Sequence, residues 1–198
     1  MRGQRSTETP TPHPPSLHFV PLGHPLPQGE RESSTPPLRG GRDKKDADVK
    51  KPNLAIRPLR PDERAEWEAL WNGYLTFYET SLPKEVSDAT WERLHDAREP
   101  MFALGAYADD RLVGIAHYLF HRSCWTIGNY CYLQDLFVAQ NARGSGAGRA
   151  LIAAVEKAAR EAGASRLYWL TKEDNMSARA LYDKVAERSG FIQYRKLF

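Results

Sequence analysis

The chain has 198 residues, which is enough for one domain with a sizeable core and too few for two ordinary ones. It is 41% hydrophobic and 11% aromatic, as globular proteins are, and no stretch approaches the ~18 consecutive apolar residues of a membrane-spanning helix. The net charge of +3 is too small to indicate a strongly basic nucleic-acid-binding domain or a strongly acidic one.

The composition changes sharply near residue 52. Most of the 14 prolines and none of the five tryptophans lie in residues 1–52. Such a segment cannot bury enough apolar surface to offset the entropy lost on ordering, so we predict a disordered Pro-rich tail there and one folded domain over 53–198. The positive excess lies in the tail but forms no dense patch, so we expect no nucleic-acid or membrane partner. An alternative is a misassigned start of the gene, with Val49 as the initiation site.

The cysteines and histidines point away from a metal or disulfide framework. Cys124 and Cys131 flank a predicted hairpin turn and belong to no CxxC or Cys/His cluster, and three of the six histidines lie in the tail. We interpret the cysteines as free thiols of a cytoplasmic protein, with pairing across strands left open, and predict no metal site.

Beyond residue 52 the apolar pattern predicts alternating strands and helices. Alternating apolar residues over 54–58 predict a first strand, and Pro61 opens an amphipathic helix. Pro83 ends this helix, and Ser87 is expected to cap a shorter one. Three antiparallel strands, a helix, a short strand, another helix and a closing strand follow. Their ranges are 101–107, 112–120, 130–138, 151–162, 167–170, 178–185 and 191–197. The predicted fold class is α/β with a mixed sheet.

A glycine-rich run from Arg143 to Arg149 joins the third of these strands to the next helix. Unpaired N–H groups at a helix N-terminus, with the positive end of the helix dipole behind them, bind phosphate, and glycines let the backbone approach the anion. An ordinary turn needs one glycine, whereas this run has three at alternate positions. A GxGxxG fingerprint fails because position 149 is arginine, and a P-loop fails because Lys and Ser or Thr do not follow Gly148.

The run resembles the RxxGxG signature of the GNAT superfamily of acetyl-CoA-dependent N-acetyltransferases, here Arg143, Gly146 and Gly148. The resemblance covers residues 54–198 in element order, and the segments 133–138 and 170–185 are similar to Hpa2/Hpa3-type and diamine acetyltransferase-like members. It implies a mixed, mostly antiparallel central sheet flanked by helices. It also implies acetyl transfer to a primary amine of a small molecule such as a polyamine or an amino acid, in a ternary complex.

The resemblance further implies how acetyl-CoA is held. The backbone of one strand end pairs with the pantetheine arm like an added strand, and the amides of the glycine-rich run hold the pyrophosphate. The implied cofactor-binding residues are Leu136, Phe137, Val138, Arg143, Gly144, Ser145, Gly146, Ala147, Gly148, Arg149 and Asn175.

The transfer needs a proton acceptor and a proton donor. A primary alkyl amine has a pKa of about 10.4, so most of it is charged near neutral pH and must lose a proton before it attacks a thioester. Asp135, next to the cofactor strand, is the first candidate base and Glu79 the second. The alternative for Asp135 is a carboxylate that only satisfies a neighbouring backbone group. Relatives often carry Glu at the position of Gln134, so this chain lacks one possible base there. Tyr182 matches the family's phenol donor to the departing thiolate, with an aromatic role in the core as the alternative.

The acceptor site is predicted at the end of the first helix. Relatives bind the amine there, and the candidate residues are Trp71, Tyr74, Tyr78 and Glu79, with Gln134 on a strand. An aromatic wall with one carboxylate would suit a cationic substrate. The alternative for these aromatics is the core. Two other functions also stay open, namely an acetyl-CoA sensor without turnover and acetylation of a protein lysine or N-terminus. Dimers are common among relatives, so a homodimer is left open as well.

Overall fold

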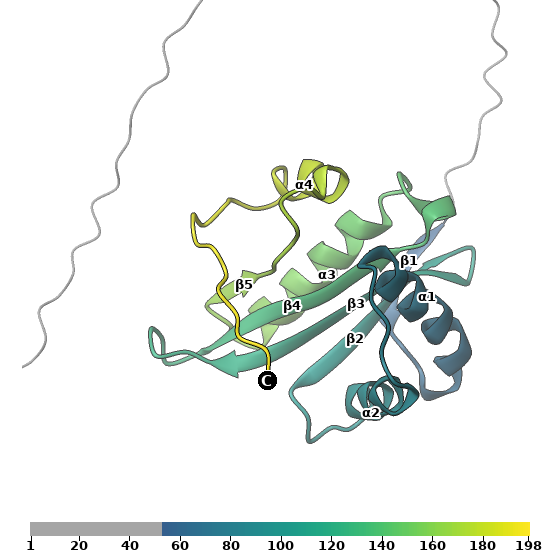
Figure 1. The fold of residues 1–198 in the computed structure, drawn as a ribbon, viewed down its shortest axis with the longest axis horizontal. Coiled ribbons are helices and arrows are strands. Elements are labelled where there is room, and N and C mark those ends of the chain that lie inside the picture. Colours follow the sequence, from purple (N-terminus) through teal and green to yellow (C-terminus); the bar gives the residue numbers. More distant parts are fainter. Residues whose placement is uncertain (1–52) are drawn as a thin grey trace, which may run out of the picture. The chain divides into compact units, whose positions relative to one another are not determined.

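The computed structural model describes residues 53–198, so the predictions for the tail over 1–52 lie outside the described residues. Its centre is a five-stranded sheet in the order β1-β2-β3-β4-β5, antiparallel except for the parallel pair β4 and β5 (Figure 1). The strands are β1 Leu54–Pro58, β2 Met101–Ala108, β3 Arg111–Arg122, β4 Asn129–Val138 and β5 Arg166–Tyr168. The predicted α/β fold, with a mixed and mostly antiparallel sheet flanked by helices, is confirmed.

Helices cover both faces of this sheet (Figure 1). On one face lie α1 and α2, and on the other lies α3, whose apolar side packs against the strands. The helices are α1 Arg64–Phe77, α2 Lys84–Leu94, α3 Ala147–Glu161 and α4 Met176–Tyr182, with short 3₁₀ turns at Pro61–Glu63 and Gln140–Ala142. No helix of residues 53–198 is long and apolar enough to cross a membrane.

The start of α2 differs from the sequence prediction. The helix begins at Lys84 with Pro83 as its N-cap residue, one turn before Ser87. Ser87 lies one turn inside α2, where its hydroxyl accepts a hydrogen bond of 3.1 Å from the indole of Trp71. The predicted cap is therefore wrong, and the serine instead joins α2 to α1.

Two apolar cores lie on the two faces. The core under α3 includes Leu133, Leu151 and Val155, which are almost completely buried. Cys131 is buried in the same core, which raises the pKa of its thiol to about 11, while Cys124 is exposed, and both thiols are free. The core under α1 is built from aromatic rings, with Trp67 at its centre.

The end of β4 is the least regular part of the sheet. Opposite β3, the pairing passes from Leu133 to Asp135, so Gln134 is an extra residue that forms a β-bulge. On its other side β4 pairs with β5 only as far as Tyr132. Among residues 53–198, the outer edge of β4 from Leu133 to Val138 thus has no neighbouring strand. This open edge faces the start of α3.

The end of the chain departs most from the prediction. β5 has three residues instead of the four expected, and residues 191–197 form no strand. Phe191, Tyr194 and Leu197 are each about four-fifths exposed or more. Strand-forming side chains make a strand only beside a hydrogen-bonded neighbour, and this segment has none among the described residues. The predicted closing strand is therefore wrong.

Candidate active site

The glycine-rich run forms a tight loop that ends at the first turn of α3. Gly144 and Gly146 have φ angles of +81° and +95°, a left-handed conformation that glycine adopts without strain. Gly146 is the N-cap residue of α3. The amides of Gly144, Gly146, Gly148 and Arg149 donate no hydrogen bond to any other described residue. The loop therefore presents several free N–H groups at the positive end of a helix dipole.

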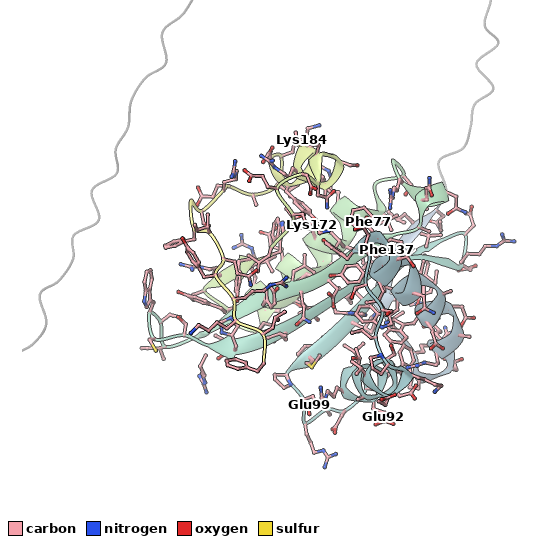
Figure 2. All side chains as sticks on the ribbon, viewed as in Figure 1. Phe77, Glu92, Glu99, Phe137, Lys172 and Lys184 are labelled. Carbon is pink, nitrogen blue, oxygen red and sulfur yellow. The ribbon has the colours of Figure 1, made fainter. Side chains whose placement is uncertain are left out.

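A groove of about 550 Å³ runs from this loop along the open edge of β4. It is lined by the end of α1, the end of β4, the glycine loop and α4. Figure 2 shows Phe77 of α1 and Phe137 of β4 close to each other, and both residues line this groove. All the predicted cofactor-binding residues line the groove except Ser145, whose hydroxyl instead accepts a hydrogen bond from the amide of Ala147.

Two contacts hold the groove in shape. Arg143 donates from its Nε to the carbonyl of Val138, which ties the loop back to β4. Gly73 lies against the ring of Phe137 so closely that a Cβ there would come within 2.9 Å of the ring. A glycine at this position lets α1 approach β4 and places its last turn beside the groove.

Asn175 lies at the other wall, at the N-cap of α4. Its side chain accepts a hydrogen bond from the amide of Ala178 and donates one of 3.1 Å to the hydroxyl of Thr171. These bonds shape the start of α4 and place Asn175 on the groove lining.

Tyr182 ends α4 and lines the same groove. Its ring packs against Trp169 with the centroids 5.4 Å apart, and its hydroxyl makes no hydrogen bond within residues 53–198. Burial, with a smaller effect from nearby Tyr78, raises the pKa of Tyr182 to about 12. The phenol therefore keeps its proton near neutral pH and is available as a donor.

Asp135 lies beyond the groove lining on the α1 face and is 8% exposed. Its Oδ2 lies 3.0 Å from Nδ1 of His117, and Nε2 of His117 accepts a 2.8 Å hydrogen bond from the indole of Trp67. The sequence analysis did not identify His117. A signal was present, since a polar residue in the apolar strand segment around Ile115 and Ala116 is an unusual pattern that indicates a buried polar site.

Three tyrosines surround the Asp135 carboxylate. Burial and the negative charge of Asp135 raise the pKa of Tyr74, Tyr78 and Tyr132 above the ordinary value for tyrosine. Tyr78 also lines the groove and is an electrostatic neighbour of Tyr182. It therefore lies between the groove and the carboxylate.

The other predicted acceptor residues are more scattered. Trp71 is 5% exposed and stacks between Trp67 and Tyr74, so the structure places it in the core and not at the groove. Glu79 is exposed just after α1, with a positive φ of 53°. Gln134 is exposed at the bulge of β4. Among the predicted acceptor contacts, only Tyr78 reaches the groove lining.

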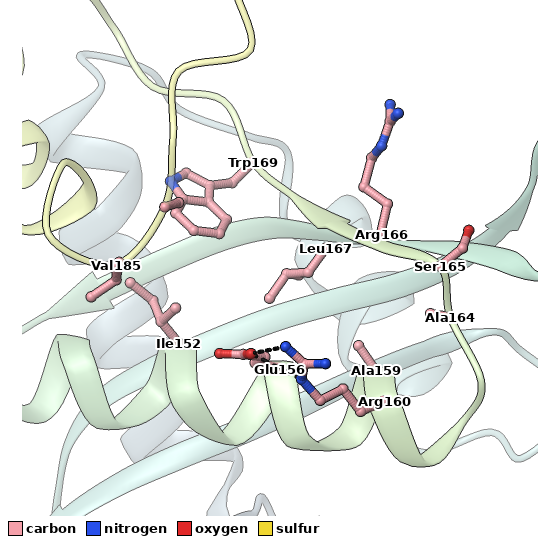
Figure 3. A pocket seen from close by; sticks show the side chains of 11 residues that line it. Ile152, Glu156, Ala159, Arg160, Ala164, Ser165, Arg166, Leu167, Trp169 and Val185 are labelled. Carbon is pink, nitrogen blue, oxygen red and sulfur yellow. Dashed lines mark hydrogen bonds and ion pairs between the residues drawn. The ribbon is translucent and has the colours of Figure 1, made fainter. Parts of the chain in front are cut away.

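A second hollow, of about 240 Å³, lies between α3 and β5 (Figure 3). Its walls include Ile152, Leu167 and Trp169, with an ion pair of 2.7 Å between Glu156 and Arg160 at its edge. None of the predicted site residues lines it.

Known proteins resemble this chain in sequence and fold. The sequence pattern of the Acetyltransferase (GNAT) family matches residues 67–186. D-amino-acid N-acetyltransferase HPA3 from Saccharomyces cerevisiae is 32% identical over 145 residues, spanning 72% of this chain and 90% of the yeast protein. Thialysine N-epsilon-acetyltransferase from Caenorhabditis elegans is 31% identical over 133 residues, 67% of this chain and 82% of that protein. The solved structure of aminoglycoside N-acetyltransferase AAC(6')-Iy in complex with CoA matches with a TM-score of 0.63 and 20% identity, over 75% of this chain and 97% of that one.

The chain belongs to the GNAT acetyltransferase family. It is an acetyl-CoA-dependent N-acetyltransferase, as the sequence predicted, and the relatives are consistent with the predicted Hpa2/Hpa3-type and diamine acetyltransferase-like subgroup.

Proposed function

We propose that this enzyme moves the acetyl group of acetyl-CoA directly to the primary amine of a small molecule, such as an amino acid or a polyamine, while both substrates are bound. The observation that carries the proposal is the groove itself. Free amides of the glycine loop, the open edge of β4 and the Tyr182 phenol all line one continuous space.

The groove residues fit coenzyme A by their chemistry. Free N–H groups of Gly144, Gly146, Gly148 and Arg149 suit a pyrophosphate, because such groups at a helix N-terminus bind anions. The open edge of β4 from Leu136 to Val138 suits the amides of the pantetheine arm, which would bind it as an added strand does. When bound, acetyl-CoA supplies an acetyl thioester to the acceptor.

Two side chains of the protein move protons in the proposed reaction. Asp135 takes a proton from the incoming ammonium, so that the neutral nitrogen forms the C–N bond as the C–S bond breaks. Tyr182 gives its proton to the departing sulfur and recovers one from the nitrogen, which has an N–H to lose after the C–N bond forms. The products are the acetamide and the free thiol, and Asp135 returns its proton to solvent.

The acceptor side supports a small cationic amine. Tyr74, Tyr78 and Tyr132 lie near the Asp135 carboxylate, and aromatic rings together with a buried negative charge attract an ammonium group. The names of the yeast and nematode relatives refer to a D-amino acid and to thialysine, both small amines. Glu79 and Gln134, which are exposed near this side, remain proposed as further acceptor contacts.

An assay of thiol release from acetyl-CoA over a panel of amines tests the proposal. The panel includes D- and L-amino acids, polyamines, aminoglycosides and a lysine-containing peptide. We expect turnover with a small amine, and we expect Tyr182→Phe to lower kcat about 100-fold, a typical effect of losing a general acid. Tyr118→Phe is the matched control, since Tyr118 is a buried tyrosine of the α3 face that does not line the groove.

The other outcomes identify the rival functions. Turnover with the peptide alone would indicate a protein acceptor. Binding of acetyl-CoA without turnover on any amine would indicate a sensor. A Tyr182→Phe variant as active as Tyr118→Phe would remove Tyr182 from the proposed chemistry.

A further inference from the structure

A buried row of polar side chains crosses the α1 core and ends at Asp135. Trp67 is completely buried and His117 is 3% exposed. The indole N–H of Trp67 donates to Nε2 of His117 at 2.8 Å, and Nδ1 of His117 lies 3.0 Å from Oδ2 of Asp135. These three residues come from α1, β3 and β4, which are distant in sequence.

The chemistry of the indole decides where the His117 proton lies. An indole nitrogen only donates hydrogen bonds, so Nε2 of His117 must be the acceptor and carries no proton. The proton of the neutral imidazole is then on Nδ1, which donates it to Asp135. A charged imidazolium would place a second N–H against the indole N–H. Trp67 therefore selects a neutral His117 with one tautomer.

Aromatic packing holds this row rigidly. The ring of Trp67 stacks on Trp71 with the centroids 5.7 Å apart, and both rings lie within 6 Å of the imidazole. A rigid imidazole gives its hydrogen-bonded carboxylate a defined orientation.

The carboxylate is left with one oxygen for other partners. Oδ2 of Asp135 is occupied by His117, and the hydroxyl of Tyr74 is the other hydrogen-bonding neighbour of this carboxylate, so Oδ1 keeps a lone pair for a further donor. The charge of Asp135 acts on Tyr74 and Tyr78, and Tyr78 lines the groove. The carboxylate is thus next to the tyrosine that borders the space where the proposed function places the acceptor amine.

We infer that His117 and Trp67 are positioning residues for acetyl transfer, an inference that rests on the proposed function. His117 holds Oδ2 of Asp135 so that Oδ1 receives the proton of the acceptor ammonium. His117 keeps its own proton on Nδ1 throughout, and Trp67 keeps His117 in the tautomer that this role requires. The ammonium becomes a neutral amine as Asp135 becomes a carboxylic acid, so charge and protons balance without a further reactant.

Four variants, each measured for kcat, KM and the free energy of unfolding, test this role. His117→Leu removes the donor to Asp135, and His117→Asn keeps an amide N–H near the place of Nδ1. Trp67→Phe removes the indole donor but keeps an aromatic ring. Ser87→Ala is the matched control, because it leaves another buried indole on the same face, that of Trp71, without its partner.

We expect His117→Leu to lower kcat by about 10-fold to 100-fold, as misplacement of a reacting group does, with little change in KM for acetyl-CoA. His117→Asn should recover most of this loss, and Trp67→Phe should lower kcat severalfold. Ser87→Ala should lose stability without losing kcat. A purely structural role would instead give equal kcat in His117→Leu and Ser87→Ala, and this result would overturn the inference. If His117→Leu does not fold, unchanged kcat in both Trp67→Phe and His117→Asn overturns it.

Nitrogen-15 spectra of His117 in the full chain give a readout that does not depend on turnover. A protonated Nδ1 and a bare Nε2 support the inference, and the opposite tautomer overturns it. If the wild-type enzyme transfers acetyl to no amine, the proposed function and this inference fail together. If it does and Tyr182→Phe lowers kcat while His117→Leu matches the control, only this inference fails.

Discussion

The two faces of the sheet bury different kinds of side chain. Under α3 the core is apolar, built around Leu133, Leu151 and Val155. The buried polar and charged residues among 53–198 all lie on the α1 side instead. They are Glu63, Ser87, His117 and Asp135.

Because the two faces bury different side chains, we expect one face to determine mainly stability and the other mainly catalysis. Burying a polar group costs free energy unless it is hydrogen-bonded, and each of these four side chains has a partner. The groove takes residues from both sides of the sheet, namely Tyr78 just after α1 and the free amides at the start of α3. We therefore expect changes under α3 to alter folding and changes around Asp135 to alter catalysis.

The largest effect on stability is expected under α3. Val155→Ala should lower the free energy of unfolding by about 2 to 3 kcal/mol, because it removes two buried methyl groups and leaves a cavity. Urea unfolding measures this loss, and kcat of the folded enzyme should stay unchanged. Val86→Ala, at a half-exposed valine of α2, is the control and should change little. A large loss of kcat in Val155→Ala would contradict the separation of the two faces.

Glu63 tests the same contrast between the two faces. It is a buried charged residue on the α1 face, but it has no part in the proposed reaction. Its carboxylate bonds Arg57 at 2.6 Å and accepts the hydroxyl of Tyr107, and the bond to Arg57 lowers the pKa of Glu63 from 4.5 to about 2. A lowered pKa stabilises the fold above pH 4.5, and this contribution is lost as the pH falls toward 2.

Glu63→Gln should therefore lower the free energy of unfolding by about 2 kcal/mol near neutral pH, and the difference from wild type should shrink in acid. Unfolding curves at several pH values check this, and kcat should not change. Glu68→Gln breaks only a partly exposed pair with Arg64 and should lose less than about 1 kcal/mol. A difference that grows in acid would contradict the assigned ion pair.

The glycine loop allows a comparison within one helix. Gly146 and Gly163 lie at opposite ends of α3 and both have positive φ, with open space where a Cβ would point. Alanine at either position should cost about 1 kcal/mol of stability because of backbone strain. Only Gly146→Ala should also raise KM for acetyl-CoA, by about 10-fold, since a shifted loop misplaces the free amides. Equal KM values in both variants would argue against the loop as the anion site.

The smallest effect is expected from removing residues 1–52. We propose that residues 53–198 contain the whole catalytic domain, so the shortened chain should keep the kcat and the unfolding midpoint of the full chain. Loss of activity on truncation would assign the tail a part in the reaction.

The parts of the site that depend on local sequence were predictable. Glycines at alternate positions before an amphipathic helix identify an anion-binding loop, and the strand before it follows from its apolar pattern. Tyr182 was predicted from the family resemblance, because it follows Asn175 at the spacing of the family's phenol donor. The structure then places these residues along one groove.

The parts that depend on contacts between distant segments were not predictable. Trp67 and His117 are 50 residues apart, and only the packing of α1 on β3 brings their nitrogens together. The helical spacing of the aromatic residues around Trp71 is the same whether that helix face contacts substrate or the core. In the structure Trp71 lies in the core. The prediction of a closing strand after Gly190 was wrong because strand-forming residues do not reveal whether a neighbouring strand is present to pair with them.

Amide NMR spectra recorded during a titration with coenzyme A test most directly whether the glycine loop is the donor site. We predict that the signals of Gly144, Gly146, Gly148 and Arg149 move downfield as their free N–H groups bind the pyrophosphate, while that of Gly163 stays in place. Saturable binding that leaves these four amides unmoved, or an absence of binding, would contradict the assignment of the groove.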